Sequence, residues 1–318
     1  MKKDKDKNSF FSRITHNVKI RFQWLQENFK KNLQNIKENC FIKKSNNSWV
    51  PLMIPYVILM ILLIVAPLFI LLLYALISPT NDVLIFDFTI NNFKSFFYEQ
   101  SFLASLRRSL LYATVATFFA ILIGYPVAYL MAFSKSKLVS KNIWILVTLP
   151  IWINMLVKTI GLKTMFDLIE RITNVHLLGT PIAIVIGMIY MFIPFVIIPI
   201  FNSLDKMDRS WIEASKDLGA SPYQTFWRIT FRYSMPGIIT GIIFMLLQAA
   251  TSLIVVKYMG QEKITLISSI IEAYFFQGAN FGLAAAISVF LGFIILLLVI
   301  VLRLLGKRIY GKVGRNND

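Results

Sequence analysis

Residues 210–221 read SWIEASKDLGAS, a polar stretch that lies between two long apolar runs of the chain. Ser210 is followed three residues later by Glu213, which is the spacing of a capping box, so we expect a short helix to begin near Trp211. Gly219 suits the residue just past a helix, where the backbone adopts a positive φ that glycine tolerates best. The stretch therefore predicts a short helix that ends in a sharp turn.

A second helix is predicted directly after that turn. Residues 221–224 read SPYQ, which combines a capping box with proline at the first helical position. The first helix carries Trp211, Ile212 and Leu218 as an apolar side, and it has nothing of its own to bury them against. An amphipathic helix of this kind is typical of a segment that docks into a groove on a partner protein.

Long uncharged apolar runs indicate that the chain crosses a membrane. Of its 318 residues 57% are hydrophobic, and the mean hydropathy is +0.65. Charges are costly inside hydrocarbon, so runs without Asp, Glu, Lys or Arg are the signature of spanning helices. The third run has only 16 uncharged residues, and its helix is extended past Lys158, whose side chain can reach the membrane surface. We expect an all-α membrane protein with six transmembrane helices at about 53–78, 109–133, 142–162, 181–203, 234–256 and 283–302.

The basic charge of the chain is concentrated on one side of the predicted membrane. The formal net charge is +17. One side holds residues 1–48, 134–141, 204–233 and 303–318 with a net charge of +16, and the other side holds +1. The positive-inside rule then places both termini in the cytoplasm. Anionic membrane lipid is a sufficient partner for the basic excess, so we expect no nucleic acid.

Three segments make up the predicted domain organisation. Residues 1–48 form a basic arm whose apolar residues recur every three or four positions, which favours a helix lying on the membrane surface over a partly disordered tail. Residues 49–305 form the transmembrane domain, including the loop 204–233. Residues 306–318 form a basic cytoplasmic tail.

Small residues and prolines add detail to the predicted bundle. Stripes of small residues let helix backbones approach closely, and we favour contacts within the chain over a dimer seam. The stripes comprise Ala116, Ala120, Gly124 and Ala128, then Gly237 and Gly241, and then Ala284, Ser288 and Gly292. Proline lacks a backbone donor, so helices are expected to be interrupted at Pro126, Pro150, Pro194 and Pro199.

The loop also resembles a known family. EASKDLGAS at 213–221 resembles the EAA motif of the permeases of binding-protein-dependent ABC importers, in which a glycine follows the last alanine by four residues. The apolar tail that ends in Pro236 and Gly237 is similar too. Residues 149–163 and 192–208 resemble the third helix and the fourth helix with its exit in the B-type spermidine and putrescine permeases. The resemblance covers roughly residues 50–305.

The resemblance implies a type I ABC importer permease (MetI-like) fold in which the loop 204–233 carries a coupling helix. That helix docks into a cleft of an ABC ATPase subunit, and by residue-by-residue transfer Glu213, Ala214 and Gly219 are contact and hinge positions. The predicted coupling set is Trp211, Glu213, Ala214, Ser215, Leu218 and Gly219. The resemblance also implies two ATPase subunits that bind ATP and Mg, a second permease subunit, and an extracytoplasmic substrate-binding protein or lipoprotein, all at a bacterial plasma membrane.

Three positions depart from the family pattern. Ser215 stands where the motif has a second alanine, and Arg232 replaces a proline that often precedes the fifth helix. Lys257 lies where an acidic residue is usual after the fifth helix. A lysine that faces a polycation is unfavourable. Lys257 therefore leaves open the possibility that the cargo is a solute other than a polyamine.

The chain lacks the motifs of an enzyme. It contains no GxxxxGK[ST], HExxH or GxSxG, so we expect a non-catalytic subunit without a cofactor or metal of its own. Aromatic faces can hold a cation, and polar groups in mid-membrane can line a path. The candidates for a substrate path are Trp152, Asn154, Tyr190 and Gln248, with ordinary packing as the competing interpretation of each.

The favoured function is ATP-driven import of spermidine or putrescine by alternating access. The same machine with an anion, metal or vitamin as cargo is the first alternative. A carrier or channel that works alone is the second, and the absence of acidic residues from all six runs disfavours it.

Overall fold

The computed structural model describes residues 50–77, 88–276 and 280–314. Within them the chain is helical apart from its loops, and the extended pairing is one bridge between Ile77 and Phe88. The chain divides into two units, 1–66 and 67–318. The predicted basic arm at 1–48 lies outside the described residues.

The first spanning helix is apolar on all sides. It is built from α2 (Val50–Met60), the π-helical turn η1 (Ile61–Val65) and α3 (Ala66–Ala75). Its membrane-length part is Met53–Ala75, three residues shorter than the predicted 53–78. A helix without a polar face suits a lipid surrounding.

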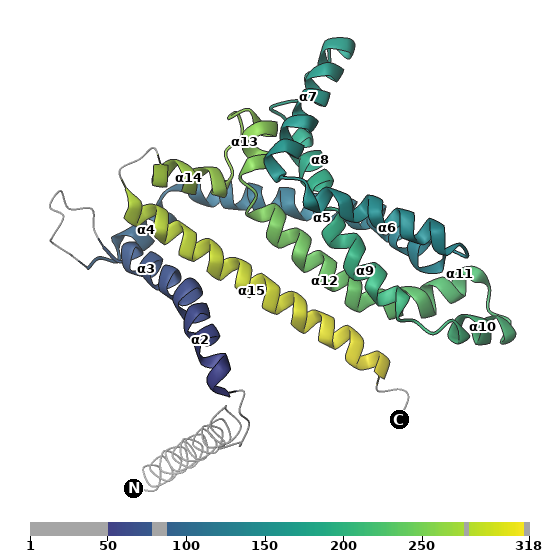
Figure 1. Cartoon of the computed structure of the whole chain (residues 1–318). Coiled ribbons are helices and arrows are strands. Elements are labelled where there is room, and N and C mark those ends of the chain that lie inside the picture. The colour runs from purple at the N-terminus through teal and green to yellow at the C-terminus, as the bar shows by residue number, and fades with distance from the viewer. Residues whose placement is uncertain (1–49, 78–87, 277–279, 315–318) are drawn as a thin grey trace, which may run out of the picture. The chain divides into compact units, whose positions relative to one another are not determined.

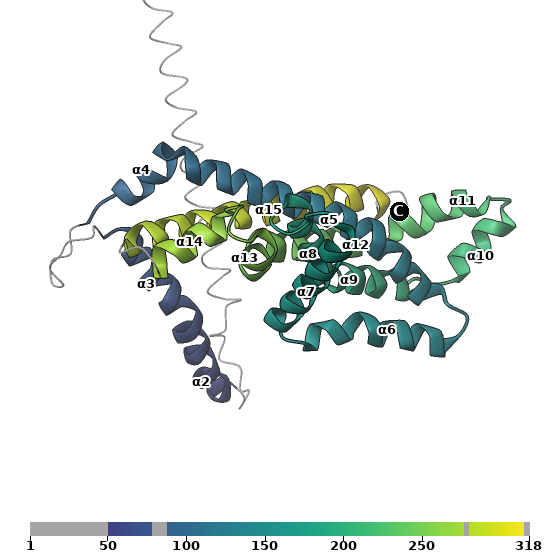
Figure 2. The ribbon, with the colours of Figure 1, turned by 90° about the horizontal axis from the view of Figure 1, so that it is seen from above.

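Three helices form the centre of the second unit. α5 (Gln100–Phe133), α9 (Pro194–Asp205) and α12 (Phe231–Ala250) contact one another, and Figures 1 and 2 both show them side by side. A Cβ added at Gly237 would come within 2.8 Å of the Ile200 Cα, so α12 and α9 touch backbone to backbone there. Glycine makes this close approach possible.

The predicted small-residue contacts within the chain are confirmed on α5 and α12. These residues are buried in the core, and they are Ala116, Ala120, Gly124, Ala128, Gly237 and Gly241. On the last helix Ala284 is buried, but a Cβ on Gly292 would meet no atom within 4 Å. That third stripe is therefore packed only in its first part.

The third span is broken, so the single helix predicted over 142–162 is wrong. α6 (Lys137–Trp152) and α7 (Met155–Thr173) meet at an angle of 103°. Ile153 is extended, and the side chain of Asn154 accepts a hydrogen bond from the Leu156 N–H at 2.8 Å. An N-cap of this type starts a new helix, which explains the elbow.

The fourth span bends where a proline interrupts it. α8 (Pro181–Phe192) and α9 meet at 44°, with Ile193 between them and Pro194 opening α9. The predicted interruption at Pro194 is confirmed. It is wrong at three other prolines, which lie inside continuous helices, namely Pro126, Pro150 and Pro199.

The fifth span begins in the loop and ends early. α11 (Pro222–Thr225), the π-helical turn η2 (Phe226–Thr230) and α12 form one helical stretch of 29 residues. The helix runs straight through Arg232, where the family often has proline. It stops at Ala250, and α13 (Ile254–Gly260) is a separate helix, so the predicted end at residue 256 is wrong.

The remaining helices complete the unit. α4 (Asn91–Tyr98) precedes α5, and α14 (Ile267–Phe276) precedes α15 (Phe281–Gly314). Because α15 continues to Gly314, the boundary predicted between 305 and 306 falls inside a helix. By length and composition four of the described helices can cross a membrane, and six spans result if each bent pair counts as one.

Two hydrogen bonds to opposite ends of α5 define the two ends of the second unit. Arg209, in the loop after α9, donates from Nη2 to the Ala132 carbonyl near the end of α5 at 3.4 Å. The Ile267 N–H, at the start of α14, donates to the Ser109 hydroxyl in the first part of α5 at 3.0 Å. The loop 204–233 and the α5–α6 connection therefore share one end, called here the loop end. α13 and α14 lie at the other, the far end (Figure 1).

Candidate functional site

The helix α10 (Ser210–Asp217) begins where expected but is capped by a different residue. Ser210 is its first helical residue, and the Ser210 N–H donates to the Asp208 carboxylate at 3.0 Å. This hydrogen bond lowers the pKa of Asp208. The capping box predicted from Ser210 and Glu213 is therefore wrong: Arg209 occupies the N-cap position without a side-chain capping bond, and the Asp208 carboxylate instead binds the N–H of the first helical residue.

The turn after α10 has the predicted geometry. Gly219 has φ +77°, and its N–H donates to the Lys216 carbonyl at 2.8 Å. The Ala220 N–H donates to the Ser215 carbonyl at 3.0 Å. These two bonds form a Schellman motif, which satisfies carbonyls that the helix end leaves free. The predicted positive φ at Gly219 is confirmed.

The second capping box is also confirmed. The Gln224 N–H donates to the Ser221 hydroxyl at 3.3 Å, and the Ser221 N–H donates to the Gln224 side-chain oxygen at 3.0 Å. Pro222 occupies the first helical position. α11 thus starts at a fixed point, two residues after the glycine turn.

A buried hydroxyl pair joins α10 to α11. The Ser215 and Thr225 hydroxyls lie 2.9 Å apart, and the Ser215 hydroxyl also donates to the Ile212 carbonyl at 2.8 Å. Because that proton is used on Ile212, Thr225 is the donor to Ser215. Ser215 therefore lies in the seam between the two helices. The Ser215 hydroxyl binds Thr225, whereas the alanine that the family motif has at this position could not form this bond.

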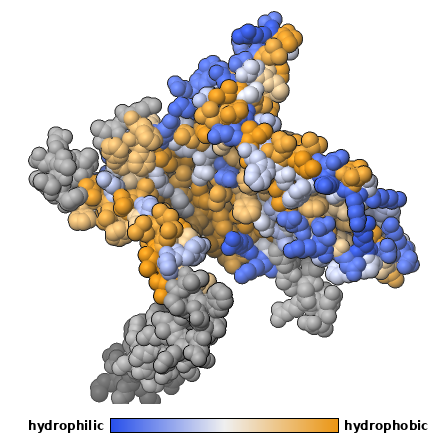
Figure 3. All heavy atoms as spheres, viewed as in Figure 1, coloured by the Kyte–Doolittle hydropathy of each residue, from blue (hydrophilic) through white to orange (hydrophobic). Residues whose placement is uncertain are grey.

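The rest of the predicted coupling set faces outward. Leu218 is 88% exposed, and Glu213 and Ala214 are exposed as well. Trp211 is about half exposed, and its ring contacts Tyr233 edge-on at a centroid distance of 5.7 Å. Figure 3 shows mainly hydrophilic atoms around α10 and α11, so these apolar side chains stand within a polar surface.

An aromatic cluster connects the loop to the membrane helices. The Phe226 ring lies 5.8 Å from the rings of both Tyr125 and Tyr129 on α5. The Tyr125 hydroxyl lies 3.1 Å from that of Ser234 on α12. Sequence reasoning missed this cluster, and the run of aromatic residues FWRITFRY at 226–233 was its only signal.

Two of the four predicted path residues lie at the α6–α7 elbow, and the other two lie on α8 and α12. Trp152 is 88% exposed at the α6–α7 elbow, and Asn154 caps α7. Tyr190 is 44% exposed on α8, and Gln248 is half-buried on α12. None of them lines the cavities described between α5 and α8 or between α9 and α12.

Lys257 is paired at the far end of the unit. Its ammonium lies 2.8 Å from the Glu272 carboxylate, and this hydrogen-bonded ion pair raises the pKa of Lys257. The positive charge that the family pattern does not have is therefore neutralised locally.

The fold and its helix–turn–helix loop define a permease-type component of a membrane transporter. The chain belongs to the family of binding-protein-dependent transport system inner membrane components, whose model matches residues 120–313. It is accordingly a multi-pass, non-catalytic component of a transport system.

Its relatives include spermidine/putrescine transport system permease proteins PotB. The protein from Haemophilus influenzae is 32% identical, with 72% of this chain and 83% of that protein covered. The protein from Escherichia coli is 32% identical, with 70% and 86% covered. A PotB homolog from Mycoplasma pneumoniae is 31% identical over 43% of this chain and 49% of its own length.

Solved structures show the same fold. A chain of a bacterial ABC transporter that imports the acidic polysaccharide alginate matches with a TM-score of 0.67 at 19% identity, covering 87% of this chain and 99% of that one. A chain of the inward-facing MetNI methionine ABC transporter matches with a TM-score of 0.53 at 20% identity, covering 66% and 95%.

Proposed function

We propose that the chain is the permease subunit of an ATP-driven importer of spermidine and putrescine in a bacterial plasma membrane. The names of its relatives support this cargo. The Lys257–Glu272 pair supports it too, because it removes the unpaired cation that would repel a polycation at the far end.

Coupling to ATP hydrolysis is assigned to α10. The observation that carries this assignment is Leu218, a leucine that is 88% exposed at the C-terminal end of α10, directly before the glycine turn. A side chain of this kind at the tip of a polar loop is suited to a groove on a partner. The partner is an ABC ATPase subunit, which binds the ATP and Mg.

Motion of the ATPase subunit is transmitted from α10 to the membrane helices through α11 and α12, which form one helical stretch. The Ser215–Thr225 pair fixes α10 to α11, and α11 continues into α12 without a break. Phe226 passes the displacement on to Tyr125 and Tyr129 of α5. Alternating access then follows from the movement of α5 and α12 when the ATPase subunits close.

The remaining parts of the machine follow from this arrangement. A second permease subunit completes the path, and an extracytoplasmic binding protein or lipoprotein delivers the cargo at the far end. The loop end faces the cytoplasm, and the positive-inside rule assigns both termini to the cytoplasm as well, because the basic charge of the sequence is concentrated on that side.

Uptake of labelled spermidine by cells that carry the full set of subunits tests the proposal. Leu218→Ala is expected to reduce both uptake and recovery of the ATPase subunit with this chain. Leu138→Ala, at a leucine 73% exposed on α6, is the matched control and should change neither. Undiminished ATPase recovery and uptake with Leu218→Ala would refute the docking role. Uptake of another solute in place of spermidine would refute the assignment of the cargo and leave the docking role of α10 intact.

A further inference from the structure

The break between α12 and α13 has no local cause in its residues. Thr251, Ser252 and Leu253 separate the two helices, and they include neither proline nor glycine. Sharp interruptions of a helix usually have a local cause such as one of these residues. The uncharged run of the sequence predicts one helix through 256, so contacts with other parts of the chain must impose the break.

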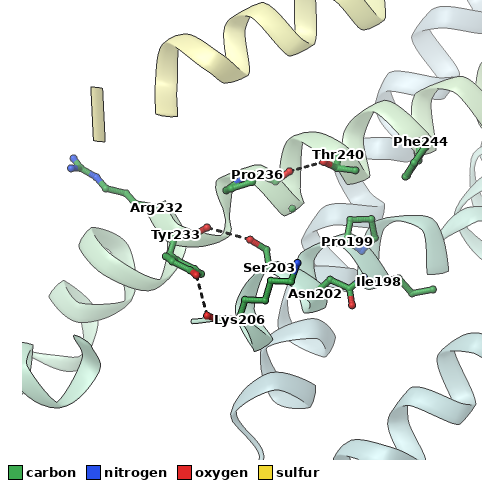
Figure 4. A pocket seen from close by; sticks show the side chains of 11 residues that line it. Ile198, Pro199, Asn202, Ser203, Lys206, Arg232, Tyr233, Pro236, Thr240 and Phe244 are labelled. Atoms are coloured by element: carbon green, nitrogen blue, oxygen red, sulfur yellow. Dashed lines mark hydrogen bonds between the residues drawn. The ribbon is translucent and has the colours of Figure 1, made fainter. Parts of the chain in front are cut away.

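Hydroxyl side chains in the spanning helices of this chain donate to a carbonyl one turn earlier. The Thr240 hydroxyl donates to the Pro236 carbonyl at 2.8 Å (Figure 4). At the end of α12 the Thr251 hydroxyl donates to the Leu247 carbonyl at 2.8 Å. Ser252, the next residue, is buried, and among the described residues its hydroxyl has no hydrogen-bond partner. The break therefore leaves one buried hydroxyl unsatisfied.

The unsatisfied hydroxyl favours a continuous helix over the break. A buried hydroxyl without a partner carries the full penalty of its removal from water. If α12 continued through this segment, the Ser252 hydroxyl could donate to the Gln248 carbonyl, four residues earlier. The composition of the segment and its buried hydroxyl thus both favour the helix that the structure interrupts.

Two interactions with α14 hold the break in place. The Ser268 hydroxyl donates to the Ser252 carbonyl at 3.1 Å, and this bond is buried. The Lys257 ammonium, on α13, lies 2.8 Å from the Glu272 carboxylate. Ser268 and Glu272 are four residues apart and share one face of α14. This face therefore binds both the break and the helix that follows it.

α14 can act as an anchor because it is fixed to α5. The Ile267 N–H donates to the Ser109 hydroxyl at 3.0 Å in the interior. The Tyr274 ring meets the Phe102 ring edge-on at a centroid distance of 5.9 Å. α14 therefore stays with the centre of the unit, and α13 is bound to it through polar contacts.

The turn after α13 is strained. Gln261 and Glu262 have φ +47° and +59°, so two consecutive residues with side chains adopt the left-handed region. Conformations of this kind persist only where surrounding contacts impose them. The Gly179 N–H donates to the Met259 carbonyl at 2.8 Å and fixes the last turn of α13. α13 thus lies between an imposed break and an imposed turn.

We propose that residues 251–253 are a hinge with two states. In the described state α13 is turned away from α12 and is held by α14. In the second state α12 continues through 256 as one helix, which satisfies the Ser252 hydroxyl and relaxes the turn after α13. Conformational transitions of proteins commonly use elements that have two discrete packings.

Straightening of the hinge opens the far end of the unit. Val255 packs so closely on α8 that a Cβ added at Gly187 would lie 2.8 Å from the Val255 Cγ1. A continuous helix withdraws Val255 from this contact and Lys257 from Glu272. The role of the hinge in import rests on the proposed alternating access, whereas the two states themselves do not depend on the cargo.

The distance between two spin labels tests for the second state. The labels are placed at Arg232→Cys on α12 and Tyr258→Cys on α13, with Cys40→Ser in the background. The full-length chain is measured in nanodiscs with the subunits that copurify with it. In a continuous helix, residues 232 to 258 span about 39 Å, and the bent form gives a shorter distance. The shorter distance should dominate without nucleotide, and the longer one should grow when ATP and vanadate trap the complex.

Three substitutions should shift the ratio of the long to the short distance in opposite directions. Ser268→Ala removes a buried hydrogen bond of the bent form and should raise the ratio about fivefold. Lys257→Met should raise it less, because exposed ion pairs contribute little. Ser252→Ala, added to Ser268→Ala, removes the unsatisfied hydroxyl of the bent form and the new bond of the straight form. It should therefore lower the ratio again, by about fivefold.

Matched controls separate the hinge from general effects of removing polar groups. Ser288→Ala removes a hydroxyl that donates to the Ala284 carbonyl within α15, and Lys94→Met removes an exposed lysine of α4. Neither should change the ratio. A single distance in every variant and nucleotide state, or a higher ratio when Ser252→Ala is added, would overturn the hinge.

Thermal unfolding gives an independent measure. Ser252→Ala should raise the unfolding temperature in detergent, because the described state then no longer buries an unsatisfied hydroxyl. A lower temperature would show that the hydroxyl is satisfied in this state, and would also overturn the hinge. Spermidine uptake is measured separately. Normal uptake without distance shifts refutes the hinge alone, and distance shifts without uptake refute the proposed function alone.

Discussion

The Ser215 and Thr225 hydroxyls lie 2.9 Å apart in a buried seam, ten residues apart in sequence and on opposite sides of a glycine turn. The pair holds α10 at a fixed angle to α11. Since α11 runs on into α12, this one hydrogen bond sets how the exposed tip of the loop is oriented relative to a membrane-spanning helix.

Thr225→Val is expected to loosen that seam. The substitution preserves shape but removes the donor to Ser215, at a cost of about 1 kcal/mol to the local structure. Hydrogen exchange of the α10 amides should rise and spermidine uptake should fall, with membrane insertion unchanged. Ser215→Ala, which restores the residue of the family motif, should have a smaller effect. Exchange in α10 as slow as in the wild type would contradict the proposed role of the pair.

Gly219→Val is expected to abolish uptake without preventing insertion. The positive φ of Gly219 strains a β-branched residue by about 1–3 kcal/mol, so the Schellman turn opens and α10 loses its orientation. Gly292→Val is the control, because that glycine has open space around it and no positive φ. Transport assays on membranes with matched protein levels distinguish the two. Normal transport by Gly219→Val would rule out the turn as a coupling element.

Alanine at the buried glycines of α12 should destabilise the protein in a graded way. At Gly237 the added carbon would lie 2.8 Å from the Ile200 Cα, at Gly241 it would lie 3.2 Å from the Val196 Cα, and at Gly292 it meets nothing. Overpacking costs about 1–3 kcal/mol where backbone must move. Thermal unfolding in detergent should therefore show the largest loss for Gly237→Ala, a smaller one for Gly241→Ala and none for Gly292→Ala. Any other order would mean that α9 and α12 are not in backbone contact.

The first turn of α10 should depend on the hydrogen bond that Asp208 accepts from the Ser210 N–H. Its pKa is lowered by the hydrogen bond from the Ser210 N–H, so the carboxylate form is favoured by the folded loop. The sign follows: this stabilisation is complete above the ordinary pKa of an aspartate and is lost as pH falls through the lower pKa of the folded state. At neutral pH Asp208→Ala should increase proteolysis of the loop, whereas Asp208→Asn should resist it, because asparagine can also accept the bond. Equal cleavage of the two variants would show that Asp208 does not cap the helix.

The local features of the protein could be predicted from the sequence alone. The uncharged runs indicated a membrane protein, because the cost of charge in hydrocarbon depends on composition alone. Gly219, Ser221 and Gln224 predicted the turn and the second cap, because these interactions span five residues or fewer. Leu218 was predicted to be exposed for the same reason, since the loop offers nothing to cover it.

The remaining features depend on how the helices pack and could not be predicted from the sequence. The elbow at Asn154 lies inside an apolar run of the sequence. Asn154 can either continue the helix or cap a new one, and the hydropathy of the run does not distinguish these two outcomes. Three other contacts join segments that a turn or a whole helix separates. They are the Ser215–Thr225 bond, the Lys257–Glu272 pair and the close approach of α9 and α12 at Gly237. Such pairings depend on how helices pack, and that packing is a property of the whole bundle rather than of any one stretch.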